Sequence, residues 1–124
     1  MNVLLWIAAG ALAAVFLPAG VMKLGRTPGQ LAASGLGWAE DFGARRVKVV
    51  GALEVLAALG LVLPPLAGVA EILTPVAATG VVALMTGAAI THGRRGEFRM
   101  ITVNIALLAP AAVVAWGRFG PQAF

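Results

Sequence analysis

The residue best suited to chemistry is Glu54, a carboxylate inside a long apolar run. It follows Val47 by seven residues, so at ~1.5 Å per residue a helix would carry it ~10 Å beyond the start of that run. A charged side chain at such a depth in a bilayer costs at least ~2.5–3.5 kcal/mol, and it therefore needs a partner, water or a proton. We predict that Glu54 is either the acid or base of a membrane-embedded enzyme, or a neutral or paired glutamate that holds helices together.

Four other polar residues are candidates for the same site. Lys23, His92 and Asn104 each lie at or near the end of a different apolar run, in the same half of the membrane as Glu54. We predict His92 and Lys23 as its catalytic partners, and Asn104 and Thr91 as substrate-binding residues. Lys23, His92 and Asn104 also have simpler interpretations. Lys23 is then a topology anchor that reaches the interface, His92 an interfacial residue, and Asn104 an interhelical hydrogen-bonding group.

The composition excludes most metal and thiol chemistry. The chain has no cysteine and a single histidine. Disulfides, thiolate metal sites, multi-histidine metal sites and bis-histidine haem within one chain are therefore excluded. We predict no metal ion, and no motif indicates a cofactor.

The elements that must position these residues are membrane helices. Of 124 residues, 60% are hydrophobic and 11% charged, against roughly 25% charged in soluble domains. Four apolar runs are long enough to cross ~30 Å of hydrocarbon as helices, at residues 3–22, 47–63, 72–91 and 100–116. A backbone in lipid must satisfy its own hydrogen bonds, and no alternating strand pattern appears. We predict an all-α, four-helix transmembrane bundle, formed by residues 1–124 as a single domain.

The basic residues predict the orientation of this bundle. Eight of the nine lie in the first and third loops or their flanks, and only Arg118 lies elsewhere. The positive-inside rule then places these loops in the cytoplasm and both termini outside it. The net charge of +4 is explained by the basic residues that set the membrane orientation, so no nucleic-acid partner is expected. The first run also resembles a signal peptide with a cleavage site at Ala11-Leu12-Ala13, but it lacks a basic n-region.

Several motifs between the runs predict where helices begin and end. Thr27-Pro28-Gly29-Gln30 has the spacing of a capping box and predicts a short interfacial helix. Trp38 is expected to anchor this segment in the headgroup zone. We expect Pro64-Pro65 to end the second membrane helix, Thr74-Pro75 to cap and begin the third, and His92-Gly93 to end it.

Small residues recur every four positions on the third membrane helix, at Thr79, Ala83, Gly87 and Thr91. Small side chains at this spacing let membrane helices approach closely. The preferred interpretation is packing inside the bundle. The alternative is a contact face for a second copy of the chain or for a protein partner.

A set of motifs in fixed order carries a family resemblance. The motifs are Ala19-Gly20-Val21-Met22-Lys23-Leu24, Val50-Gly51-Ala52-Leu53-Glu54-Val55-Leu56, Gly60-Leu61-Val62-Leu63-Pro64, Leu73-Thr74-Pro75-Val76-Ala77-Ala78, Thr91-His92-Gly93-Arg94-Arg95-Gly96-Glu97 and Asn104. Over nearly the whole chain they resemble the DoxX-like family of small bacterial four-helix membrane proteins. The resemblance implies a four-helix membrane bundle, with Lys23, Glu54, His92 and Asn104 at the family's recurring polar positions. The broader group is named after a subunit linked to a thiosulfate:quinone oxidoreductase, so a tie to redox or sulphur metabolism is implied.

Two hypotheses about function follow. The first is an accessory or partner-binding component of a redox or envelope process, acting in the lipid bilayer with protein partners or as a homo-oligomer. The second is a membrane-embedded enzyme that acts on a lipophilic substrate, a lipid or quinone-like molecule, with Glu54 as acid or base. A transporter subunit is a third alternative, which a single inward cavity in so small a chain supports weakly.

Overall fold

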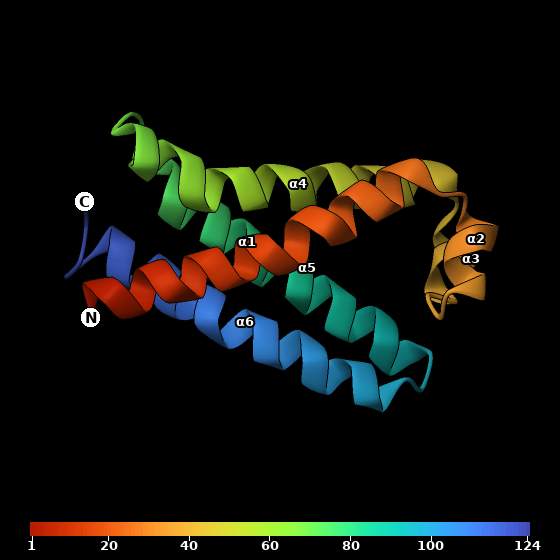
Figure 1. The fold of residues 1–124 in the computed structure, drawn as a ribbon. Helices are drawn as coiled ribbons and strands as arrows, with labels where there is room; N and C mark the ends of the chain where they lie inside the picture. The colour runs from red at the N-terminus through yellow and green to blue at the C-terminus, as the bar shows by residue number, and fades with distance from the viewer.

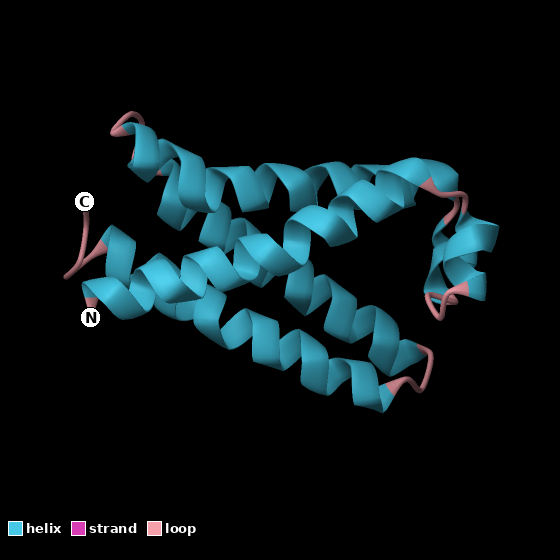
Figure 2. Ribbon diagram, viewed as in Figure 1, coloured by secondary structure: helices cyan, strands magenta, loops and turns pink.

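The prediction of an all-α fold is confirmed. The computed structural model describes residues 1–124 and contains helices without strands (Figure 2). The six helices are α1 (Asn2–Gly25), α2 (Pro28–Ala33), α3 (Trp38–Phe42), α4 (Ala44–Ala67), α5 (Leu73–Arg94) and α6 (Phe98–Phe119). Four of them, α1, α4, α5 and α6, are long and apolar enough to cross a membrane. They run past the predicted segments into polar flanks, because a backbone can stay helical outside the hydrocarbon.

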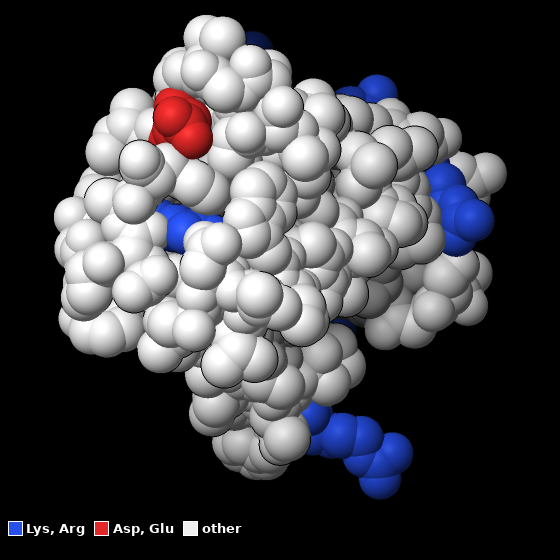
Figure 3. Space-filling view, turned by 60° about the vertical axis from the view of Figure 1, so that its left-hand side comes forward, with Lys and Arg blue, Asp and Glu red and all other residues white.

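The four long helices form two pairs that diverge toward one end of the molecule (Figure 1). Helix α1 packs along α4 and α5 packs along α6, while α4–α5 and α1–α6 contacts join the pairs. Both termini and the α4–α5 turn lie at one end, called here the terminal end. The opposite end, called here the basic end, holds α2, α3, the α5–α6 turn and eight of the nine basic residues. Figure 3 brings the terminal end forward and shows a face with few charged side chains.

Helices α1 and α4 meet backbone to backbone at Gly20 and Gly51. A Cβ on Gly20 would lie 2.6 Å from the Gly51 carbonyl oxygen, and a Cβ on Gly51 would lie 2.8 Å from the Lys23 Cβ. Only glycine therefore allows this approach. Lys23 and Glu54 each follow one of these glycines by three residues, so the glycine contact brings both side chains to the same helix interface.

The segment between α1 and α4 is fixed at the basic end. The predicted capping box is confirmed: the Gln30 N–H donates to Thr27 Oγ1 at 3.2 Å, and the Thr27 N–H donates to Gln30 Oε1 at 2.9 Å. Leu31 and Trp38 are buried with Val47 of α4 in a small apolar cluster. Trp38 is therefore covered by protein, and not the exposed headgroup anchor that the sequence suggests.

The predicted ends of α4 and α5 are both too early. Helix α4 continues through Pro64-Pro65 to Ala67 and ends at Gly68, whose φ of 69° is left-handed and suits glycine. Helix α5 continues past His92-Gly93 to Arg94. Both helices therefore continue beyond the motif that was expected to end them.

Thr74 explains why two consecutive prolines do not end α4. Pro64-Pro65 cannot donate hydrogen bonds to the carbonyls of Gly60 and Leu61, which therefore need another donor. The Thr74 hydroxyl lies 3.3 Å from both carbonyl oxygens and supplies it. Thr74 consequently does not cap α5, which begins one residue earlier, at Leu73.

The prediction that the small-residue row of α5 packs inside the bundle is wrong. Thr79, Ala83 and Gly87 are exposed, and a Cβ on Gly87 would meet nothing within 4 Å. The buried face is the adjacent one, formed by Thr74, Ala78, Val81, Met85 and His92. Both faces carry small or apolar residues, so periodicity alone could not separate them.

A buried arginine holds the two termini together at the terminal end. Arg118 Nη1 donates to Asn2 Oδ1 at 2.7 Å and to the Gln122 carbonyl oxygen at 2.8 Å. Its guanidinium lies 3.9 Å from the centre of the Phe124 ring, which packs edge-on against Trp6. These contacts fold the last residues of the chain back over the bundle.

Candidate functional site

Lys23 and Glu54 form an ion pair inside the bundle. The Lys23 Nζ donates to Glu54 Oε1 at 2.5 Å, and the two side chains are 12% and 3% exposed. The Lys23 ammonium also lies 5.6 Å from the centre of the Trp38 ring. The pairing lowers the free-energy cost of placing a carboxylate at this depth in the membrane, because each charge is neutralised by the other.

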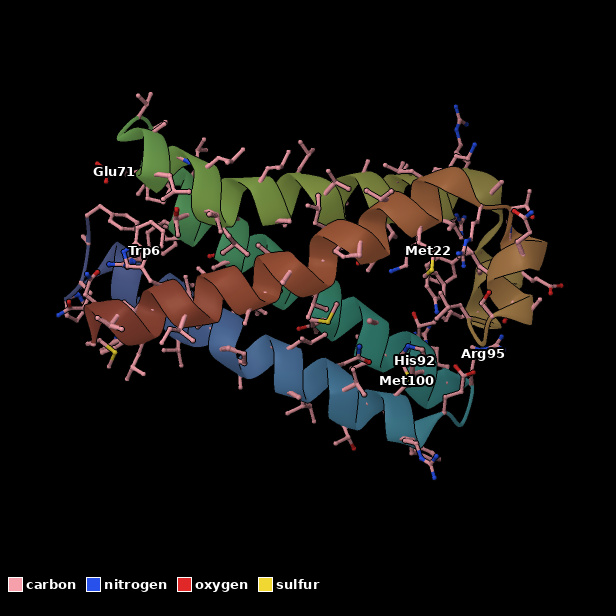
Figure 4. All side chains as sticks on the ribbon, viewed as in Figure 1. Trp6, Met22, Glu71, His92, Arg95 and Met100 are labelled. Atoms are coloured by element: carbon pink, nitrogen blue, oxygen red, sulfur yellow. The ribbon has the colours of Figure 1, made fainter.

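His92 lies on α5 at the basic end and is buried, with 6% of its surface exposed (Figure 4). Its Nδ1 lies 2.9 Å from Glu97 Oε1, across the α5–α6 turn. The hydrogen bond from His92 holds the pKa of the Glu97 carboxyl below its usual value, and Arg95 adds to this effect. His92 is therefore oriented by Glu97, and it is not the partner of Glu54 that the sequence analysis proposed.

Arg95 connects this histidine to the segment between α1 and α4. Its Nε donates to Glu97 Oε1 at 3.1 Å, and its Nη1 donates to Asp41 of α3. The sequence analysis missed both carboxylates. The position of Glu97, five residues after His92 across a short turn, is a local signal that could have identified it. Asp41 is 54 residues from Arg95, and no local pattern indicates their contact.

Asn104 of α6 is buried and only partly satisfied. Its Nδ2 donates to Met85 Sδ of α5 at 3.7 Å, while its Oδ1 is buried without a hydrogen-bond partner. Thr91, the other candidate for substrate binding, donates from Oγ1 to the Gly87 carbonyl of its own helix at 3.0 Å. Asn104 thus does link two helices, as its simpler interpretation expects, but it keeps one polar atom free.

One cavity of about 920 Å³ brings all five predicted residues together. It lies between the two diverging helix pairs, and its wall is formed by α1, α4, α5, α6 and Trp38. Most of the wall is apolar, and the polar groups are those of Lys23, Glu54, Thr91, His92 and Asn104. Exposed residues of all four long helices also line it, among them Val15 of α1, Leu56 of α4, Gly80 of α5 and Val103 of α6, so the cavity is continuous with the outer surface of the bundle.

The cavity is suited to an amphiphilic guest. Apolar pockets of this size with a few convergent polar groups are typical of small-molecule sites in proteins. No three His, Asp or Glu side chains lie close enough together to hold a metal ion. Acid–base groups and hydrogen-bonding groups are therefore the chemistry that this wall provides.

Four apolar helices around an inner polar cluster define a small multi-pass membrane protein, whose environment is a lipid bilayer. The chain belongs to the DoxX-like family, whose model matches residues 7–114. Comparisons with curated proteins and with solved structures gave no match. The family assignment confirms the resemblance drawn from the sequence motifs.

Proposed function

We propose that the protein binds a membrane-soluble amphiphile in this cavity. The apolar body of the molecule lies against the walls formed by α4, α5 and α6, and its polar end lies among Lys23, Glu54, His92 and Asn104. The observation that carries the proposal is the cavity itself, because one apolar space gathers the polar residues of four different helices. Its continuity with the outer surface of the bundle gives such a molecule a path from the surrounding lipid.

The proposed orientation of the protein determines which leaflet the polar end of the cavity faces. With eight of nine basic residues at the basic end, this end faces the cytoplasm and both termini face outside, in a bacterial inner membrane. The polar end of the cavity then lies toward the cytoplasmic leaflet, and the bound molecule has its polar end on that side.

Catalysis on the bound molecule is a natural extension of this function. Glu54 and His92 are the acid–base candidates, and Lys23 holds the Glu54 carboxylate in place at 2.5 Å. Asn104 and Thr91 are the residues that would position the substrate. An enzyme of this kind would act on a lipid or quinone-like molecule.

An accessory role in a redox or envelope process is the second candidate. The exposed row of small residues on α5 favours it, because no other helix of the chain covers Thr79, Ala83 or Gly87, two of which, Ala83 and Gly87, lie at the edge of the cavity. A second copy of the chain or a protein partner would cover this row.

Mass spectrometry of the protein purified with its native lipids tests the first proposal against the second. We expect a specific amphiphile in constant ratio to the chain, lost in a Gly80→Phe variant. Gly80 lines the cavity, and an added Cβ would meet nothing within 4 Å, so phenylalanine is chosen there to narrow the space. Gly10→Phe is the matched control, because Gly10 is exposed on α1, equally open and outside this cavity. Stoichiometric proteins without a bound amphiphile would favour the accessory role.

A further inference from the structure

Asn104, which lines the polar end of the cavity, carries an unsatisfied acceptor, its buried Oδ1. The amide donates from Nδ2 to Met85 Sδ at 3.7 Å. The reverse orientation would set the amide oxygen against the sulfur, and both are acceptors. The observed orientation is therefore the favoured one. It leaves a buried oxygen that no donor in the chain reaches.

His92 provides a second acceptor. Glu97 is ionised, since His92 and Arg95 lower the pKa of its carboxyl, and a carboxylate only accepts hydrogen bonds. The proton between them consequently lies on His92 Nδ1, 2.9 Å from Glu97 Oε1. In the neutral ring Nε2 is then an acceptor. The one side-chain hydrogen bond of His92 is made by Nδ1, which leaves Nε2 free.

The ion pair adds a third acceptor and no free charge. Lys23 donates one of its three ammonium N–H groups to Glu54 Oε1, so the charges of the two side chains cancel, while the other N–H groups can donate to an oxygen of the ligand. The one hydrogen bond of the Glu54 carboxylate is accepted by Oε1, which leaves Oε2 free. An anionic head group would therefore find no unmatched cation among the five polar residues of the cavity, and it would lie close to the Glu54 carboxylate.

From these three acceptors we infer that the cavity selects a neutral amphiphile whose polar end is a hydroxyl donor. This inference rests on the proposed function and specifies its ligand. A phenol or an alcohol donates to Asn104 Oδ1 or His92 Nε2 and can at the same time accept from the Lys23 ammonium, whereas an ether or a ketone of the same size can only accept. Glu97 is a positioning residue for this selectivity, because it fixes which nitrogen of His92 carries the proton.

Matched probes separate hydroxyl donors from acceptors. The first pair is 4-dodecylphenol and its methyl ether, and the second is 1-tetradecanol and its methyl ether. 4-Dodecylbenzoate serves as the anionic probe. Binding to the full chain in micelles is measured by native mass spectrometry, with probe concentrations expressed as mole fraction in the micelle. A hydrogen bond to a buried acceptor changes affinity by roughly tenfold or more, so we expect each hydroxyl probe to bind at least ~10-fold tighter than its ether.

The outcomes distinguish this inference from the proposed function. Hydroxyl selectivity in the aromatic pair points to a phenolic ligand, and selectivity in the aliphatic pair points to a lipid alcohol; either result supports the inference. Equal binding of hydroxyl and ether probes in both pairs overturns it while leaving the amphiphile site intact. Tighter binding of the benzoate also overturns it. Failure of every probe to bind overturns the proposed function itself.

Two variants test the residues that carry the selectivity. Asn104→Leu is expected to weaken binding of the phenol and to leave that of the ether unchanged, which also reports that the bundle is folded. Glu97→Gln lets the amide donate to His92 Nδ1, so Nε2 becomes a donor and the phenol-to-ether ratio falls. Glu40→Gln is the matched control, because Glu40 is exposed on α3 and makes no hydrogen bond. An unchanged ratio in both Asn104→Leu and Glu97→Gln contradicts the assignment.

Discussion

The ion pair between Lys23 and Glu54 offers the sharpest test of how the site is held together. We consider three variants, Lys23→Met, Glu54→Leu and the double variant that combines them. Removing one partner of a buried pair leaves the other charge unpaired, which typically costs ~3–5 kcal/mol. Lys23 keeps 12% of its side chain exposed, against 3% for Glu54, so some water still reaches the ammonium. We therefore expect the lower end of that range, about 3 kcal/mol, for Glu54→Leu.

The double variant should lose much less than the sum of the two single variants. With both charges replaced by apolar side chains of similar size, no buried charge remains unpaired, and such replacements are often close to neutral. The free energies of unfolding are measured by circular dichroism during reversible titration of mixed micelles with sodium dodecyl sulfate. We expect a coupling energy between the two residues of about 2–3 kcal/mol from this double-mutant cycle.

Glu54→Gln separates the structural role from a chemical one. Glutamine keeps the shape and an acceptor for the Lys23 ammonium but cannot titrate. We expect it to fold and, if the protein is an enzyme, to lose activity.

The reasoning about the ion pair is refuted by one result of the double-mutant cycle. In that result, the destabilisations of Lys23→Met and Glu54→Leu add up to that of the double variant within about 0.5 kcal/mol, the scatter of independent sites.

Three further predictions follow from the fold. Gly20→Leu should lower the melting temperature in detergent sharply, because its Cβ would lie 2.6 Å from the Gly51 carbonyl oxygen. Gly87→Leu, which meets open space, should not lower it, and equal losses would contradict the helix contacts. Thr74→Val should cost about 1–3 kcal/mol in free energy of unfolding, since α4 carbonyls lose their donor, and an unchanged value would contradict that role. Cysteine at Ala67 should react with impermeant reagents in intact cells and cysteine at Gly96 should not; the reverse pattern would invert the orientation.

The sequence was sufficient to predict the helices and to single out the polar residues that line the cavity. Apolar runs long enough to cross a bilayer have few alternatives to helices, because the backbone must satisfy its own hydrogen bonds there. A carboxylate such as Glu54 is costly in that setting, so its position alone marks it as paired or functional. The capping box at Thr27 was equally predictable, because its two hydrogen bonds depend on a spacing of three residues.

The faces of the helices and the long-range partners were not predictable in the same way. In α5 nearly every face is small or apolar, so the pattern could not distinguish the buried face of Val81 from the exposed face of Ala83. Thr74 looked like a helix cap, and its contact with α4 depends on how the two helices cross. The contact between Arg95 and Asp41 depends on the position of α3, which no local spacing encodes.

The most direct test of the cavity as a binding site uses Trp38 as the reporter. Trp38 lines the cavity. The substitutions Trp6→Phe and Trp116→Phe remove the other two tryptophans of the chain, so that all tryptophan fluorescence comes from Trp38. The protein in lipid nanodiscs is titrated with 2-bromododecanol, whose bromine quenches tryptophan fluorescence on contact. We predict saturable quenching that Gly80→Phe abolishes and Gly10→Phe leaves unchanged. Quenching that rises without saturation, and equally in both glycine variants, would contradict a binding site in the cavity.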